Sequence, residues 1–113
     1  MISQGDVWWA DLPEPVGSGP GFRRPVVVVQ ADSFNRSALG TVLCVPLTGN
    51  LKWATAPGNA VLSARSTGLP KDSVANVSQL FAADRSQLTE RTGRISQKQM
   101  ALLLAGIDVV LGR

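Results

Sequence analysis

The 113-residue sequence predicts a mainly β domain with α (α+β class). We expect a small, strongly bent barrel of about six to seven strands with a C-terminal helix. Short apolar runs alternate with glycine- and proline-containing loops along most of the chain. The only substantial stretch with helical periodicity comes at the C-terminal end. The length is that of a single domain over residues 1–113, with no internal repeat, linker or low-complexity segment.

The composition excludes several classes of site. The chain has no histidine, no tyrosine and one cysteine, so we expect no Ser-His-Asp or Cys-His catalysis, no intrachain disulfide and no zinc cluster. That cysteine, Cys44, lies in an apolar segment and is expected to be an inert core residue, because no histidine is present to activate it. The net charge of +3 suits an acidic partner such as nucleic acid or an acidic protein.

The sequence carries no sign of a membrane protein. No apolar run approaches the ~20 residues of a membrane span. The N-terminal residues show no basic region followed by an apolar segment, so they do not resemble a signal peptide. We therefore expect a cytoplasmic protein without membrane contact, and no cofactor or metal.

The first predicted strand covers residues 6–12, where Val7 and Trp9 alternate toward the interior. Trp8 points the other way, which leaves an interface open as its role, and at least one of the two tryptophans should pack in the core. The next segment, residues 13–23, holds three prolines and three glycines, so it is a loop. Loops this long in a small domain are often functional.

Residues 25–31 form the second predicted strand. It begins at a proline and contains four consecutive valines, which indicates a central strand buried on both faces. Asp32 and Ser33 should cap a short helical turn after it. A third strand is expected over residues 41–48, where Pro46 implies an edge position or a bulge.

The second half of the chain predicts shorter elements. A polar loop covers residues 49–58 and a turn covers residues 67–72. Further strands are expected at residues 59–63, 73–80, 81–84 (continuing or re-pairing the preceding strand) and 89–95, with a single helical turn at residues 85–88.

The C-terminal helix begins at Ser96, which forms a capping box with Gln99, and ends at Gly112. Its apolar residues recur at helical spacing. They should pack on the core, with part of the face at a subunit contact: Met100, Leu103, Leu104, Ile107, Val110 and Leu111.

Phosphate-binding chemistry is suggested by the arginines beside the first loop. Arg23 and Arg24 stand where that loop meets the valine strand, and an arginine presents a planar fork of donors matched to phosphate. We expect polar residues at other strand ends to share this basic rim: Thr48, Ser73, Asn76 and Gln79. RNA supplies its own nucleophile, the 2′-OH. An enzyme with such a rim could therefore cleave RNA with neither a metal nor an activated side-chain nucleophile. Phosphate binding without catalysis fits the composition equally well.

The pair Lys52 and Trp53 in the second polar loop allows two interpretations. An exposed tryptophan beside a lysine is a plausible base-stacking contact for RNA. Alternatively, Trp53 folds back as a lid on the core.

At these residues the sequence resembles the MazF/PemK family of toxin endoribonucleases. The resemblance covers essentially the whole chain in family order and spacing. The motifs that carry it are GDVWW at 5–9, RPVVVV at 24–29, FNR at 34–36, VPLT at 45–48, GLPKDSV at 68–74, and Gln79 followed by Asp84.

The resemblance implies an SH3-like barrel that forms a homodimer. It implies the toxin of a type II toxin–antitoxin system, a metal-independent endoribonuclease that cleaves single-stranded RNA, mRNA in particular, at short sequences. Attack by the 2′-OH would give a cyclic phosphate and a 5′-OH end. The implied partner is a cognate antitoxin whose disordered, acidic tail covers the RNA groove and orders on binding.

Carried over residue by residue, the resemblance makes Arg24 and Thr48 catalytic. Arg24 would act in proton transfer and in stabilising the phosphorane, and Thr48 would hydrogen-bond the scissile phosphate. Many relatives have an acid at the positions of Gly19 and Ser78, so a carboxylate general base is missing here. The expected RNA-binding residues are Gly19, Gly21, Phe22, Arg23, Asn35, Arg36, Lys52, Trp53, Ser73, Asn76, Ser78 and Gln79.

Two alternatives remain at this point. The first is a catalytically weak RNA-binding barrel. The second is a protein like the CcdB toxins, which share the fold and poison DNA gyrase through protein contact; Arg24 and Thr48 favour the nuclease branch over it.

Overall fold

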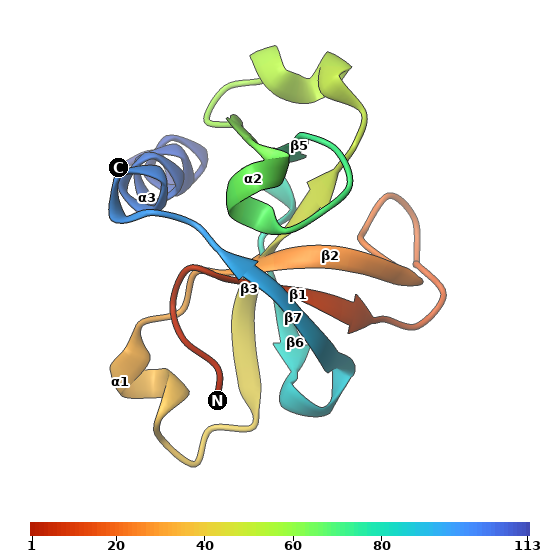
Figure 1. The fold of residues 1–113 in the computed structure, drawn as a ribbon, viewed down its shortest axis with the longest axis vertical. Coiled ribbons are helices and arrows are strands. Elements are labelled where there is room, and N and C mark those ends of the chain that lie inside the picture. The colour runs from red at the N-terminus through yellow and green to blue at the C-terminus, as the bar shows by residue number, and fades with distance from the viewer.

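Seven antiparallel strands form one curled sheet in the computed structural model, which describes residues 1–113 (Figure 1). The strands are β1 (Asp6–Asp11), β2 (Arg23–Val28), β3 (Thr41–Thr48), β4 (Ala60–Leu62), β5 (Ser73–Ala75), β6 (Phe81–Asp84) and β7 (Leu88–Arg94). Their order in the sheet is β4-β5-β3-β2-β1-β7, and β6 also pairs with β3. This architecture confirms the predicted α+β fold with a strongly bent sheet.

Three α-helices and three 3₁₀ turns complete the chain. The helices are α1 (Asp32–Asn35), α2 (Ala64–Thr67) and α3 (Gln97–Leu111), and the turns are Leu51–Thr55, Val77–Gln79 and Arg85–Gln87. The last of these confirms the predicted turn at residues 85–88. None of the helices has the length and apolar character needed to cross a membrane.

Strand β2 is central and its valines are fully buried, as the valine run predicts. Val26, Val27 and Val28 have no exposed surface. The strand begins two residues earlier than expected, so Arg23 and Arg24 belong to the sheet and not to the preceding loop.

The alternating side chains of the sheet fill two hydrophobic clusters. The first includes Val27 and lies against α3, and the second includes Val26 and Cys44. Cys44 is therefore a core residue, and burial raises the pKa of its thiol to about 12. Trp9 packs on the first cluster and Trp8 on the second. Both tryptophans thus contribute to packing, each against a different hydrophobic cluster.

Strand β3 lies inside the sheet, so the edge position or bulge predicted from Pro46 is wrong. One side of β3 pairs with β2, with Val26 opposite Pro46. On its other side β3 pairs with β6 up to Cys44 and with β5 from Leu47 onward. The Pro46 carbonyl accepts a hydrogen bond from the Asn76 amide on that second side. The missing N–H of the proline therefore falls where β3 changes partners, and no ladder bond is lost.

The strand predicted at residues 73–80 is only three residues long. After β5, the amide of Val77 donates to the Asn59 side-chain oxygen, at 3.0 Å, and not to another strand. The chain then turns through Val77–Gln79. A side-chain acceptor from another segment thus replaces the strand partner, which sequence alternation does not reveal. Helix α2 was also not predicted; Ser63 caps it, and Gly68 ends it in the left-handed conformation.

The predicted capping of α1 is also wrong. Ala31 occupies the N-cap position and makes no side-chain bond, while Asp32 lies in the first turn. The Asp32 carboxylate instead accepts the Gln4 amide at 2.7 Å and the Asn35 side chain at 3.0 Å. These hydrogen bonds, the Gln4 bond foremost, lower the pKa of Asp32 below its usual value. Asp32 therefore ties the N-terminal segment to α1.

Helix α3 has the predicted capping box and the predicted end. Ser96 and Gln99 exchange bonds of 2.8 and 3.1 Å, and Gly112 takes the left-handed conformation. Its core-facing side is narrower than predicted, because it consists of only four buried residues, Met100, Leu103, Gly106 and Ile107. The expected core residues Leu104, Val110 and Leu111 are exposed, as are Leu102 and Val109.

Two glycines hold the loop at residues 49–58 against α3. A Cβ on Gly106 would collide with the carbonyl oxygen of Gly58, and a Cβ on Gly58 would lie 2.7 Å from the Gly106 carbonyl oxygen. A glycine within a helix costs about 1 kcal/mol relative to alanine. The chain accepts this cost at Gly106 because only a bare backbone lets the loop approach so closely.

Gly106→Ala should therefore destabilise the protein although alanine is the better helix former. We expect the free energy of unfolding to fall by roughly 1–3 kcal/mol, as in other overpacked cores. Urea denaturation monitored by far-UV circular dichroism measures this change. Gly40→Ala is the matched control, since a Cβ there meets nothing within 4 Å. A Gly106→Ala protein as stable as the parent would contradict the close contact.

Candidate nucleic-acid interface

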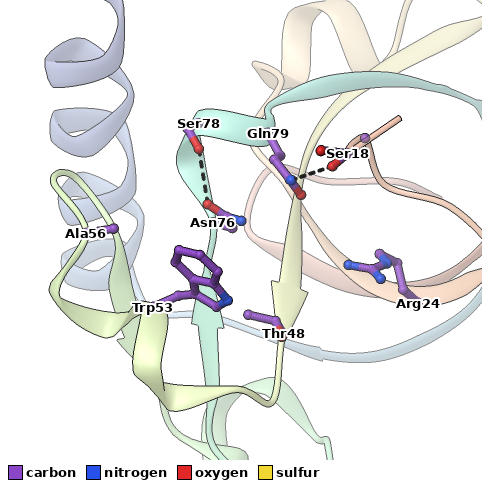
Figure 2. Close-up of a pocket in the computed structure, with 9 residues that line it drawn as sticks. Ser18, Arg24, Thr48, Trp53, Ala56, Asn76, Ser78 and Gln79 are labelled. Carbon is purple, nitrogen blue, oxygen red and sulfur yellow. Dashed lines mark hydrogen bonds between the residues drawn. The ribbon is translucent and has the colours of Figure 1, made fainter. Parts of the chain in front are cut away.

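A cavity of about 520 Å³ opens where the ends of β2 and β3 meet the two polar loops (Figure 2). It brings together seven of the residues singled out from the sequence, and two that were not, Ser18 and Ala56. The lining residues are Ser18, Gly19, Arg24, Thr48, Trp53, Ala56, Asn76, Ser78 and Gln79.

The pairing of β2 with β3 places Arg24 and Thr48 at the same end of two neighbouring strands. The antiparallel pairing ends with Val26 opposite Pro46. Arg24 and Thr48 each lie two residues beyond this pair, and both line the cavity. Two residues 24 positions apart therefore face one cavity because of strand pairing.

The short strand β5 supplies the next wall. Asn76 follows β5 directly, and its amide donates to Pro46 at 3.0 Å. Its side-chain oxygen accepts hydrogen bonds from the Ser78 hydroxyl at 3.2 Å and from the side-chain NH₂ group of Asn59 at 3.5 Å. These bonds fix the Asn76 side chain in the cavity wall, where its NH₂ group remains available to a ligand.

The loop at residues 13–22 forms the opposite wall and is held by one long-range bond. The Gln79 side chain donates to the Ser18 carbonyl at 2.8 Å. The loop also contains Phe22, the one non-glycine residue with a positive φ, at 58°. Arg24 donates weakly to the Gly21 carbonyl, at 3.4 Å. Gln79 thus connects the loop to the far side of the cavity.

Trp53 forms part of the rim and does not act as a lid on the core. It belongs to neither hydrophobic cluster, and 47% of it is exposed. Figure 2 shows its ring lying between Asn76 and Thr48. The Lys52 ammonium stands 5.1 Å from the ring centroid, a cation–π contact. An aromatic face beside a cation is therefore presented at the cavity mouth.

Arg24 is the only charged residue that lines this cavity, and it has no ion-pair partner. Its neighbour Arg23 differs in this respect. Arg23 lies 3.2 Å from Asp11 and 3.6 Å from Glu90, and it stacks over Trp9. With no carboxylate in its lining, the cavity carries a net positive charge suited to an anion such as a phosphate.

Several expected RNA-binding residues lie outside this cavity. Asn35 is buried, and its amide bonds Gln30 and Asp32. Arg36 makes an exposed ion pair with Asp32 at 3.9 Å and lines a separate hollow. The other residues outside the cavity are Gly21, which packs on Pro15; Phe22, which is exposed; Arg23 and Lys52, described above; and Ser73, which lines a second cavity described below.

Ser18 and Ala56, which line the cavity, were not predicted. Ser18 contributes its backbone carbonyl to the Gln79 bond, and backbone groups carry no residue-type signal. Ala56 has no side chain beyond a methyl group. Only their positions in the two long loops pointed to them.

The sequence matches one family of known proteins along nearly its whole length. The family model described as "PemK-like, MazF-like toxin of type II toxin-antitoxin system" matches residues 3–111. Endoribonuclease MazF6 of Mycobacterium tuberculosis is 41% identical over 111 residues, covering 98% of this chain and 97% of that protein. Endoribonuclease MazF of Staphylococcus saprophyticus is 35% identical over 112 residues, covering 99% and 92%.

Solved structures share the fold. MazF from Deinococcus radiodurans matches with a TM-score of 0.83 at 22% identity, covering 99% of this chain and 97% of that one. A mycobacterial endoribonuclease solved in complex with its cognate antitoxin matches with a TM-score of 0.78 at 20% identity, covering 99% and 96%. The curled sheet with a C-terminal helix is therefore common to these proteins.

Gln79→Ala should loosen the loop at residues 13–22, because it removes the bond to Ser18. A single neutral hydrogen bond corresponds to roughly 3–10-fold in a local opening equilibrium. We expect amide hydrogen exchange in that loop to accelerate by about this factor. Ser78→Ala is the matched control, since its hydroxyl bonds Asn76 and not the loop. Equal exchange in the two variants would show that Gln79 does not hold the loop.

Proposed function

Because the chain belongs to the PemK-like, MazF-like toxins of type II toxin–antitoxin systems, we infer that it is the toxin of such a system and an endoribonuclease. Its relatives over nearly the full length are named endoribonucleases. The observation that carries the inference to this chain is that Arg24 and Thr48 line the same cavity. The cavity there is positively charged, and Arg24 has no competing carboxylate.

The substrate that this geometry suits is single-stranded RNA, with mRNA as its main source. The cavity has one cation for a phosphate, amide and hydroxyl groups for base edges, and the Trp53 ring for stacking. Messenger RNA places the action of the toxin in the cytoplasm. Differences in the two loops at residues 13–22 and 49–58 would set which short sequence is cut.

Cleavage proceeds by attack of the RNA 2′-OH on the adjacent phosphorus. The O2′–P bond forms, the P–O5′ bond breaks, and the products are a cyclic phosphate and a 5′-OH end. The reaction needs no metal, because the nucleophile and the leaving group belong to the RNA. The protein's task is to align the phosphate and to stabilise the charge that develops on it.

Arg24 and Thr48 divide that task. The Arg24 guanidinium donates hydrogen bonds to the non-bridging oxygens of the phosphorane and to the departing O5′, which takes its proton from solvent. The Thr48 oxygen already accepts the Asn50 amide at 3.2 Å. Its own O–H is therefore free to donate to the scissile phosphate.

The site has no carboxylate that could act as a general base. Gly19 and Ser78, where the resemblance implies an acid, line the cavity, and neither offers a carboxylate. The proton leaving the 2′-OH therefore passes to solvent, since an arginine retains its protons at neutral pH. Rate enhancement then depends mainly on charge stabilisation by Arg24.

The partners proposed for this toxin are a second copy of the chain and an antitoxin. One structural neighbour was solved with its cognate antitoxin. An acidic, disordered antitoxin tail would place carboxylates on the unpaired Arg24 and so occupy the site in place of RNA. The homodimer would use exposed apolar side chains of the fold, such as Leu43 and Phe34.

Purified protein should cut a long single-stranded transcript in the presence of EDTA. Mapping of the cut ends should show a small set of short sequences, each leaving a cyclic phosphate and a 5′-OH. RNA that stays intact at high protein concentration would overturn the nuclease assignment in favour of a weak RNA-binding barrel. Growth arrest with intact RNA and inhibited gyrase would instead indicate a CcdB-like toxin.

Arg24→Ala should lower the cleavage rate by at least about 10²–10³, the usual effect of removing one charge-stabilising donor. It should relieve growth arrest while leaving the melting temperature unchanged, because Arg24 forms no ion pair. Thr48→Ala should cost less, about 10-fold, as the loss of one hydrogen bond. Arg65→Ala, at an exposed arginine that also forms no ion pair and lines no cavity, is the control. Cleavage by Arg24→Ala at the parent's rate would show that the site is elsewhere.

A further inference from the structure

A second cavity, of about 220 Å³, lies at the ends of the same two strands. Pro25, which follows Arg24, lines it, and so do Leu47 and Gly49, which flank Thr48. Successive residues of a strand point to opposite faces of the sheet. The Arg24 cavity and this one therefore lie on opposite sides of one strand pair. They are close together, because the residues that line them follow one another in the chain and consecutive Cα atoms are about 3.8 Å apart.

The walls of this second cavity are mainly apolar. Trp9 contributes an aromatic ring, and Arg23 stacks over that ring at 4.8 Å. Pro25 and Leu47 line it with further apolar surface. Lys71 and Asp72 add one charge of each sign, and a carboxylate oxygen of Asp72 accepts the Ala64 amide at 2.8 Å. A planar aromatic group fits such walls.

One polar group in this cavity has no partner within the chain. Ser73 is only 4% exposed, and its hydroxyl makes no hydrogen bond to another residue. Every fully enclosed polar side-chain atom of the protein does have a partner. The Ser73 hydroxyl must therefore reach the open space of the cavity that the residue lines. The hydroxyl of this otherwise buried residue thus faces the cavity alone, where it can donate to or accept from a ligand with a hydrogen-bonding edge.

We propose that this second cavity binds a nucleobase of the RNA, one that flanks the phosphate held at Arg24 and Thr48, and that Ser73 reads its edge. The inference rests on the proposed endoribonuclease function. An RNA strand that crosses the ends of β2 and β3 meets both cavities. An aliphatic side chain from a protein partner would fill the apolar walls but leave the Ser73 hydroxyl unpaired.

The test uses two variants that leave the fold intact. Ser73→Ala removes only an unpartnered hydroxyl. Gly49→Phe projects a ring at the cavity, since a Cβ on Gly49 meets nothing within 4 Å. The matched controls are Ser33→Ala, at an exposed serine on α1, and Gly40→Phe, at a glycine with equal free space. All five proteins, parent included, are assayed on the mapped cleavage sequence and on a series of RNAs in which each nucleotide in turn lacks its base.

For the parent protein, loss of one flanking base should raise KM by about 10-fold with little change in kcat, as expected for a lost hydrogen bond with stacking. Both variants should raise KM on intact RNA. Ser73→Ala should lose part of its sensitivity to that same base, because stacking remains, and Gly49→Phe should lose all of it. The control proteins should behave as the parent does. This coupling between one base and Ser73 is the result that supports the proposal.

Two results would overturn it. If the parent cleaves but Ser73→Ala and Gly49→Phe respond to every abasic position as the parent does, no base occupies the cavity. If these variants cleave normally but bind an acidic antitoxin peptide more weakly, the occupant is a protein side chain. Absence of cleavage by the parent itself would instead reject the endoribonuclease function, and direct binding of uncleavable RNA to the five proteins would then decide whether the cavity still takes a base.

Discussion

Strand β3 pairs with β2 along one side and changes partner on the other, and most features of this protein follow from that change. Up to Cys44 its second partner is β6, which closes the second hydrophobic cluster. From Leu47 onward the partner is β5. Between them lies Pro46, whose missing N–H makes the exchange possible without an unpaired donor. The cavity containing Thr48 opens at the end of β3, beside the short strand β5.

The charge of that cavity depends on where the acidic side chains are. Asp6 is fully buried and accepts bonds from Arg91 and Arg94 at 3.2 and 3.0 Å, which fastens the start of β1 to β7. Asp11 and Glu90 lie against Arg23. Since these carboxylates hold arginines elsewhere, none reaches the cavity at the end of β2. The arginine there keeps its donors for a ligand, and a site of modest size acquires a strong preference for anions.

The scaffold and the loops contribute differently to the site. Arg24 lies in a strand whose valines, Val26 to Val28, have no exposed surface, so its backbone is held firmly. The two loops are fastened by few contacts, the Gln79 bond to Ser18 on one side and the Gly58–Gly106 approach on the other. A rigid cation between adjustable walls suits a ligand with a constant phosphate and variable bases. The cation and the adjustable walls around it thus belong to separate parts of the structure.

The sequence by itself determined the features that local patterns encode. Four successive valines identified the buried central strand, and the Ser96 and Gln99 spacing identified the start of α3, because burial and capping are local properties. The motifs also pointed to Arg24 and Thr48, which the strand register brings together.

Only the tertiary structure decided which segments meet. The partner change at Pro46, the short strand β5, the bonds that use the Asn35 amide and the second cavity with the Ser73 hydroxyl all depend on pairing between residues far apart in the chain. A polar side chain can contact a ligand or can hydrogen-bond within the protein, and the partners that folding places beside it decide which. That choice is a long-range one, and no periodicity or spacing along a single chain records it.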